Sequence, residues 1–254
     1  MARTRYWQQV AAAVILSLMF TSTLTRVASA QTSDAPVSIV VSGGETISIG
    51  GVSNILIRKD DAKASLILLT GGNGKLDVGP DAKFSSGGDN VLIRNRDAFA
   101  QKGFNVLLVE SGTSLPAAVK AMAKIKRPVT VVGTSAGTQR AAQGLVEGAK
   151  PDRLVLTSGF LSRGSGPSTN MMTILPYAEL LPPTLVIHHR EDTCRFTKAG
   201  GVDPFLAWAG GRARVVWLSG GITENNPCNS RAHHGFNGQD AELVSKITEF
   251  AGKP

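Results

Sequence analysis

The residues best suited to carry out chemistry are Gly133-Thr134-Ser135-Ala136-Gly137, in which a serine stands two residues from a glycine on either side. The run Pro128-Val129-Thr130-Val131-Val132 precedes them and predicts a short buried strand, and the Ala- and Gln-rich run from Ala136 to Glu147 predicts a helix. A strand that enters a helix through a tight turn holds Ser135 Oγ above the sheet, and the glycines let the chain bend there. The pattern therefore indicates a serine nucleophile; the alternative is an incidental serine in a glycine-rich turn.

A serine hydroxyl becomes a nucleophile when an imidazole takes its proton and a carboxylate holds that imidazole in the right tautomer. Both residue types follow later predicted strands. The segment His188-His189-Arg190-Glu191-Asp192 follows one strand, and His233-His234-Gly235 lies in the long loop after the last strand. The candidates are His234 or His233 for the base, and Asp192, Glu191 or Asp203 for the acid. We favour Asp192, a few residues past its strand end, and expect His188 and His189 to line or cap that strand end.

A tetrahedral oxyanion needs fixed N–H donors. The backbone N–H of Ala136, just after the nucleophile, is one donor. The segment Thr70-Gly71-Gly72-Asn73-Gly74 follows the first buried strand and offers the second, from Gly72 or Asn73. It is no phosphate loop, because Gly74-Lys75 is followed by Leu76 rather than by Ser or Thr.

The elements around these residues alternate between strands and helices from Ala64 onward. We predict strands at 64–70, 104–110, 129–133, 153–158, 184–188 and 213–218, and helices at 90–102, 116–125, 136–147, 202–209 and 240–251. The alternation indicates an α/β fold with a mostly parallel central sheet and helices on both faces. The stretch 37–59 alternates apolar and polar residues and predicts an antiparallel hairpin at one edge. Ser158 and Ser219 precede glycines at strand ends, but neither opens a helix, so we interpret both as turn serines.

The first thirty residues have the features of a secretory signal peptide. Arg3 and Arg5 precede an apolar core at 10–20, which is too short to span a bilayer, and Ala28-Ser29-Ala30 is a small-residue cleavage site. We therefore expect a mature single domain at 31–254 that is periplasmic or secreted and not stably inserted in a membrane. A retained anchor is the alternative.

The composition and charge of the chain bear on which classes of partner it could bind. Loss of the leader, with Arg3, Arg5 and Arg26, lowers the formal net charge from +8 to +5. The remaining basic residues are scattered and not interleaved with aromatic residues, so we expect no nucleic acid partner. The histidines lack the spacing of a metal site, so we expect no metal ion and no cofactor. The sequence indicates no oligomeric state.

The mature chain resembles the α/β-hydrolase family, specifically its small exported bacterial members without a large lid. The resemblance rests on the segment 69–74, on 133–137, on Asp192 with Cys194, and on His234-Gly235-Phe236. It implies Ser135 as nucleophile, Asp192 as acid and His234 as base, in the chain order typical of this fold. Thr70 stands where many esterases of the family have His.

The resemblance implies a serine hydrolase that cleaves a small-molecule carboxylic ester or thioester through an acyl-enzyme. The alternatives are a peptidase or acyltransferase with the same triad, or a non-catalytic binding protein on this scaffold. The stretch 160–183 is the one segment that could shape a lid or an apolar acyl pocket; its apolar residues could equally seal the core.

Two cysteines, Cys194 and Cys228, remain in the mature chain, and an even count in an exported protein predicts a disulfide. Cys194 is two residues past Asp192, and Cys228 is six residues before His234. The bridge would tie the loop of the acid to the loop of the histidine; the alternative is two buried thiols.

Overall fold

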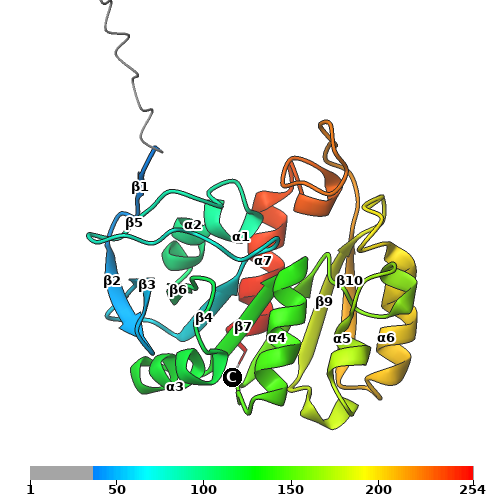
Figure 1. Ribbon diagram of the computed structural model, residues 1–254, viewed down its shortest axis with the longest axis horizontal. Coiled ribbons are helices and arrows are strands. Elements are labelled where there is room, and N and C mark those ends of the chain that lie inside the picture. The colour runs from blue at the N-terminus through cyan, green and yellow to red at the C-terminus, as the bar shows by residue number, and fades with distance from the viewer. Residues whose placement is uncertain (1–36, 254) are drawn as a thin grey trace, which may run out of the picture. The chain divides into compact units, whose positions relative to one another are not determined.

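Eight strands form one sheet in the order β10-β9-β8-β7-β4-β6-β3-β2 (Figure 1). Their bounds are β2 Gly44–Ile49, β3 Val52–Ile57, β4 Ala64–Leu69, β6 Phe104–Leu108, β7 Val129–Thr134, β8 Arg153–Thr157, β9 Thr184–His189 and β10 Ala213–Leu218. The six strands from β10 to β6 run parallel, whereas β3 and β2 pair antiparallel at one edge. The predicted mostly parallel sheet and edge hairpin are therefore confirmed.

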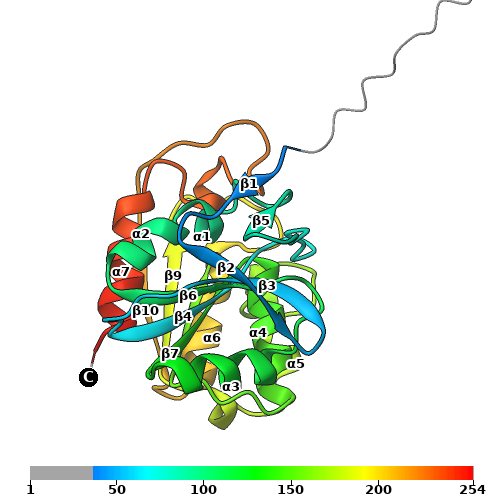
Figure 2. The same cartoon turned by 90° about the vertical axis from the view of Figure 1, so that its left-hand side faces the viewer.

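Helices cover both faces of this sheet. They are α1 Val91–Arg94, α2 Arg96–Gln101, α3 Leu115–Ile125, α4 Ala136–Val146, α5 Met171–Ile174, α6 Val202–Trp208 and α7 Asp240–Ala251, with short 3-10 turns η1 Arg163–Ser165, η2 Ala178–Leu180, η3 Ala199–Gly201 and η4 His233–Gly235. One hydrophobic core packs α1, α2 and α7 against one face, and a second packs α3 to α6 against the other (Figures 1 and 2). Strands β4, β6 and β7 are buried along their whole length, as expected of a sheet covered on both sides.

Two local features differ from the predicted elements. The helix expected at 90–102 is two helices, because the chain breaks at Asn95, whose side chain donates to Val91 O and to the carboxylate of Asp240. A separate two-stranded sheet pairs β1, Ile39–Val40, with β5, Lys83–Phe84. Both features depend on contacts between residues that are distant in the sequence, so no local sequence pattern predicts them.

The parallel strands bring their carboxyl ends to one edge of the sheet, where this fold class places its chemistry. Strand β7 lies between β4 and β8, so the loop after β4 is adjacent to the turn that carries Ser135. The loops after β9 and β10 reach the same edge and carry the acidic and histidine candidates. The architecture thus brings Ser135, the glycine loop and the loops after β9 and β10 to one edge.

The computed structural model describes residues 37–253, and this part of the chain forms one compact unit. The expected signal peptide, with its cleavage site after Ala30, lies outside the described residues. Within residues 37–253, none of the helices has the length and apolar character needed to cross a membrane.

Candidate active site

Ser135 lies on a sharp turn between β7 and α4. Its backbone has φ 52° and ψ −125°, a conformation that side-chain-bearing residues rarely adopt, and its side chain is half-buried. A Cβ added to Gly133 would lie 2.8 Å from Gly137 O, and a Cβ added to Gly137 would lie 2.2 Å from Leu69 O. The two glycines are therefore needed for close packing of backbone around the turn.

The glycine-rich loop after β4 lies directly against Ser135. A Cβ on Gly71 would lie 3.1 Å from Ser135 Cβ and 3.6 Å from Ser135 Oγ, so only glycine fits comfortably there. Gly72 has φ +56° and faces open space, which lets the loop turn away from the serine. Gly72 and Asn73, the predicted oxyanion residues, both line the pocket that contains Ser135.

Two polar side chains, Glu110 and Arg140, form hydrogen bonds to the backbone of this loop and of the residues that follow it. The sequence patterns predicted neither contact. The carboxylate of Glu110 accepts from Leu76 N at 3.2 Å and from Val78 N at 3.0 Å. The guanidinium of Arg140 donates to Thr70 O and packs over Gly74. Burial lowers the pKa of Arg140 from its usual value, and Glu110 acts in the opposite direction.

Asp192 and His234 meet in the interior, at the ends of the loops after β9 and β10. His234 Nδ1 lies 3.1 Å from Asp192 Oδ2, and the two side chains are 7% and 0% exposed. A carboxylate only accepts, so Nδ1 carries the proton and Nε2 is left with a lone pair. This is the tautomer in which an imidazole can take a proton from a serine.

Thr197 is a third member of this contact that sequence reasoning did not find. Its hydroxyl lies 3.1 Å from Asp192 Oδ2 and 2.9 Å from His234 Nδ1, and its side chain is buried. The other carboxylate oxygen, Asp192 Oδ1, accepts from Cys194 N at 2.9 Å. Both oxygens of the carboxylate are thereby fixed, and no sequence motif marks the threonine.

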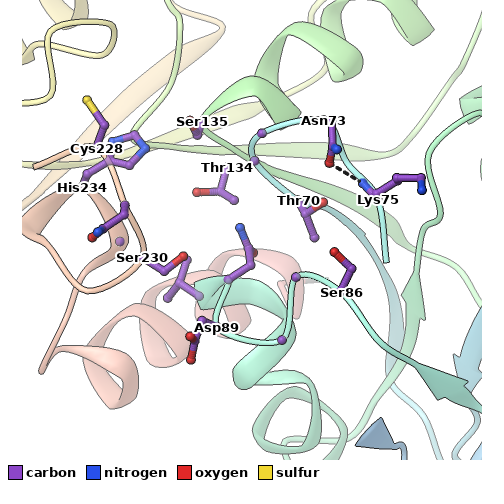
Figure 3. A pocket seen from close by; sticks show the side chains of 18 residues that line it. Thr70, Asn73, Lys75, Ser86, Asp89, Thr134, Ser135, Cys228, Ser230 and His234 are labelled. Carbon is purple, nitrogen blue, oxygen red and sulfur yellow. Dashed lines mark hydrogen bonds between the residues drawn. The ribbon is translucent and has the colours of Figure 1, made fainter. Parts of the chain in front are cut away.

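Ser135 and His234 line one pocket of about 360 Å³. Figure 3 shows His234 and Cys228 on one side of it and Asn73 and Lys75 on the other. Among the hydrogen bonds of residues 37–253, none joins Ser135 Oγ to His234. Catalytic hydrogen bonds are often long without substrate and tighten when it binds.

The alternative candidates lie elsewhere. His233 stacks on His189 with 4.5 Å between ring centroids, and Glu191 pairs with His189 at 3.5 Å. Asp203 is exposed in the first turn of α6, and neither it, His233 nor Glu191 lines the pocket. Ser158 is buried and Ser219 is exposed just after β10, both outside the pocket.

His188 lies beside the buried acid. It is fully buried on β9, with Nε2 3.8 Å from Asp192 Oδ2 and its ring edge-on to Trp217 at 5.7 Å. Burial lowers its pKa to about 4, although the Asp192 charge raises it in part. The imidazole is therefore neutral at pH 7.

A disulfide joins Cys194 to Cys228, with 4.6 Å between the two Cα atoms. The predicted bridge is present, and it links the loop of Asp192 to the loop of His234. It closes a segment in which the two cysteines are 34 residues apart in sequence.

No protein-family model matches the sequence, and no similar sequence is found among curated proteins. Solved structures do resemble the chain. The esterase Pf2001 of Pyrococcus furiosus is 16% identical with TM-score 0.56, over 82% of this chain and 89% of that one. The esterase EaEST of Exiguobacterium antarcticum is 10% identical with TM-score 0.54, over 83% and 100%.

A third structure, XC6422 of Xanthomonas campestris, is described as an α/β serine hydrolase without a lid. It is 11% identical with TM-score 0.54, over 83% of this chain and 94% of that one. Likenesses at such low identity establish architecture. Together with the sheet order and the strand–turn–helix around Ser135, they show that the chain has the α/β-hydrolase fold.

Proposed function

We propose that this protein is a serine hydrolase that cleaves a carboxylic ester or thioester, with Ser135 as nucleophile, His234 as base and Asp192 as acid. The observation that carries the proposal is the buried Asp192–His234 contact, which opens onto the same pocket as a serine on a strained turn. Strained backbone and an imidazole with a free Nε2 are the conditions under which a serine hydroxyl becomes reactive.

The proposed reaction has two steps, acylation of Ser135 and hydrolysis of the acyl-enzyme. Ser135 Oγ attacks the carbonyl carbon while His234 Nε2 takes the serine proton; the tetrahedral intermediate then expels the alcohol or thiol, which receives that proton. Water attacks the acyl-enzyme with His234 again as base, and the acid leaves as the proton returns to Ser135. Asp192 stabilises the imidazolium throughout without taking its proton.

The proposed oxyanion hole uses backbone N–H groups. Ala136 is the first residue of α4, and N–H groups at a helix start have no partner within the helix. The second donor is Gly72 or Asn73, on the loop that lies against Ser135 at Gly71. Both donors stabilise negative charge that develops on the carbonyl oxygen.

The pocket favours small or polar substrates. Most of its lining is glycine or short polar side chains, including Thr70, Asn73, Ser86, Asn90, Thr134 and Ser230. Val91 is the one large aliphatic residue that lines it within the described chain. Residues 160–183 do not contribute; Met171 and Leu175 are buried in the core, in keeping with the alternative that this stretch seals it.

The decisive experiment is labelling of the protein with a fluorophosphonate probe, followed by mapping of the labelled peptide. The label is expected on Ser135 and is expected to be lost in Ser135→Ala, which removes only the hydroxyl. An unlabelled but folded wild-type protein would instead favour the non-catalytic binding protein. Parallel assays with p-nitrophenyl acetate and a p-nitroanilide separate ester hydrolysis from a peptidase, and added alcohol acceptors reveal an acyltransferase.

The base is tested by paired variants. His234→Ala is expected to remove most ester hydrolysis, whereas His233→Ala is expected to retain most of it. Combining His234→Ala with Asp192→Asn should cost little more than the worse single change, because the groups act as a unit. The opposite result for the two histidines would move the base by one residue.

We also propose that the chain is exported and that residues 1–30 are removed. The support is the leader-like sequence together with the Cys194–Cys228 disulfide, which is typical of oxidising compartments. Mass spectrometry of protein from the periplasm and medium should give an N-terminus at Gln31. An intact N-terminus on a membrane-bound protein would contradict this proposal.

A further inference from the structure

A second cluster of titratable side chains lies beside the proposed catalytic pair and outside its pocket. His189 is the last residue of β9, Glu191 follows it, and His233 begins η4 in the loop after β10. Each offers one ligand atom, and these atoms all lie within 4.8 Å of one another. Two imidazoles and a carboxylate form a ligand set that proteins use for zinc.

The distance within the cluster already fits an ion. His189 Nδ1 and Glu191 Oε2 are 3.5 Å apart. Two ligands at about 2.1 Å from a tetrahedral zinc ion lie roughly 3.4 Å from each other. The separation of these two atoms therefore matches that of two ligands of one zinc ion.

The backbone fixes which ring nitrogens are free. His189 Nε2 lies 2.8 Å from Gly220 O, and His233 Nδ1 lies 3.2 Å from Glu191 O. Because a carbonyl oxygen only accepts, both of these nitrogens carry the protons. The lone pairs remain on His189 Nδ1 and His233 Nε2, and a carbonyl behind each imidazole is the usual support of a metal-binding histidine.

Binding requires two adjustments. The rings of His189 and His233 are stacked nearly parallel, 4° apart. Each lone pair lies in the plane of its ring, so one ion cannot lie in both planes and His233 must tilt toward it. His233 is only half-buried and Glu191 is 54% exposed, so both have room to move. The ion must also displace the Glu191 N–H that now donates to His189 Nδ1 at 3.1 Å.

We propose that His189, Glu191 and His233 bind one divalent transition-metal ion of the zinc type, with water in the fourth position. The ion joins the loop after β9 to the loop after β10, the same two loops that the Cys194–Cys228 disulfide connects. Its role is to fix these loops, since Glu191 precedes Asp192 and His233 precedes His234; it takes no part in the chemistry.

The test is a calorimetric titration of the untagged full-length or naturally processed chain with Zn²⁺ alone. We expect one ion per chain and a rise in melting temperature, because a ligand that binds only the folded state stabilises it. Mg²⁺ and Ca²⁺ should give neither effect, because they prefer oxygen ligands. Absence of saturable Zn²⁺ binding by the folded wild type would overturn the proposal.

Matched variants locate the ion. His233→Asn keeps a donor toward Glu191 O but removes Nε2, and Glu191→Gln changes an exposed side chain; each should weaken binding by at least about 100-fold, more than loss of a supporting residue does. Glu179→Gln, at an exposed carboxylate in η2, is the control and should bind as wild type does. Circular dichroism verifies that each variant is folded.

One further variant separates this site from the proposed active site. In His234→Ala, Zn²⁺ binding should persist. Loss of binding in His234→Ala with retention in His233→Asn would place the ion on the catalytic histidine and overturn the proposal. In a Cys194→Ser/Cys228→Ser protein, the rise in melting temperature should be larger, because the ion then provides a connection that the disulfide no longer supplies.

Discussion

At the scale of single residues, Thr197 decides how firmly Asp192 and His234 are held. Its hydroxyl contacts both partners, at 3.1 and 2.9 Å. A hydrogen bond to a charged group contributes about 1.5–3 kcal/mol. A loss of this free energy from the transition state corresponds to a roughly ten- to hundredfold lower rate constant. We therefore regard Thr197 as a positioning residue that acts through the pair.

Thr197→Val should lower kcat for ester hydrolysis by roughly ten- to hundredfold, with little change in KM, because the shape is kept and only the hydroxyl is lost. Thr197→Ser restores the hydroxyl and should recover most of the rate. The measurement is kcat and KM for both variants with a short p-nitrophenyl ester. Equal losses in the two variants would show that packing of the threonine methyl, not its hydroxyl, matters.

The lowered pKa of the buried His188 side chain predicts how the free energy of unfolding changes with pH. Its folded pKa is about 4, below the usual 6.5, so the unfolded chain binds the proton more readily. The stability that this group contributes is complete above pH 6.5 and is lost as pH falls toward 4, by roughly 3 kcal/mol at most.

His188→Leu, which cannot titrate, should flatten the decline in unfolding free energy between pH 6.5 and 4. Urea unfolding of both proteins across this range measures the difference. An unchanged slope would mean that His188 is protonated as easily in the folded protein as in the unfolded chain.

At the scale of elements, the close approach of the loop after β4 to the turn after β7 depends on Gly71. An alanine Cβ there would lie 3.1 Å from Ser135 Cβ, tighter than ordinary contacts, so the loop must shift by a few tenths of an ångström. A shift of this size misplaces the proposed oxyanion donors more than it disturbs the core.

Gly71→Ala should therefore lower kcat at least about tenfold while the melting temperature changes little. Gly79→Ala is the matched control, since its Cβ would meet only Lys83 O at 3.9 Å. Steady-state kinetics and thermal unfolding of the two variants make the comparison. Wild-type activity in Gly71→Ala would show that the position of this loop does not affect the rate of the reaction.

The disulfide acts between two loops rather than within the core. We expect Cys194→Ser/Cys228→Ser to lose activity while keeping its fold, because the loops of Asp192 and His234 loosen and the contact between the proposed acid and base lengthens. The stability lost should be about 4 kcal/mol or less. Activity and far-UV circular dichroism of the variant provide the check; full activity would make the bridge a support for stability alone.

At the scale of the whole molecule, the alternation of strands and helices was predictable because each buried strand and each amphipathic helix has its own pattern of apolar residues within one contiguous segment. The turn at Ser135 was predictable for the same reason: its glycines and flanking elements are contiguous. Thr197 was not, because its importance arises only when β9 and the loop after β10 come together. The break at Asn95 likewise depends on Asp240, which is 145 residues away.

The proximity of His189, Glu191 and His233 was likewise not predicted, because these residues lie on two loops that are far apart in the sequence. The expectation that the chain binds no metal ion stays a prediction, which the Zn²⁺ titration tests. The parallel order of β9 and β10 brings those loops together, a fact of topology rather than of pattern. Sequence reasoning thus succeeded where the structure is local and failed where distant segments meet.

The polar lining of the pocket leads to a prediction about substrate size. Long acyl chains gain little from a cavity of about 360 Å³ with a mostly polar lining, since burial of apolar surface needs apolar partners. Across p-nitrophenyl acetate, butyrate, octanoate and palmitate, kcat/KM should fall steadily beyond butyrate. A maximum at octanoate or longer would contradict this and indicate an apolar site elsewhere.

The order in which the site's parts occur along the chain has a consequence for biosynthesis. The glycine loop and Ser135 are made first, Asp192 later, and His234 after both. A polypeptide still emerging from the ribosome, or still crossing a membrane, would therefore possess the proposed nucleophile but not the proposed base. For the exported hydrolase that we propose, this order would keep the nascent chain inert toward esters of the cell that makes it.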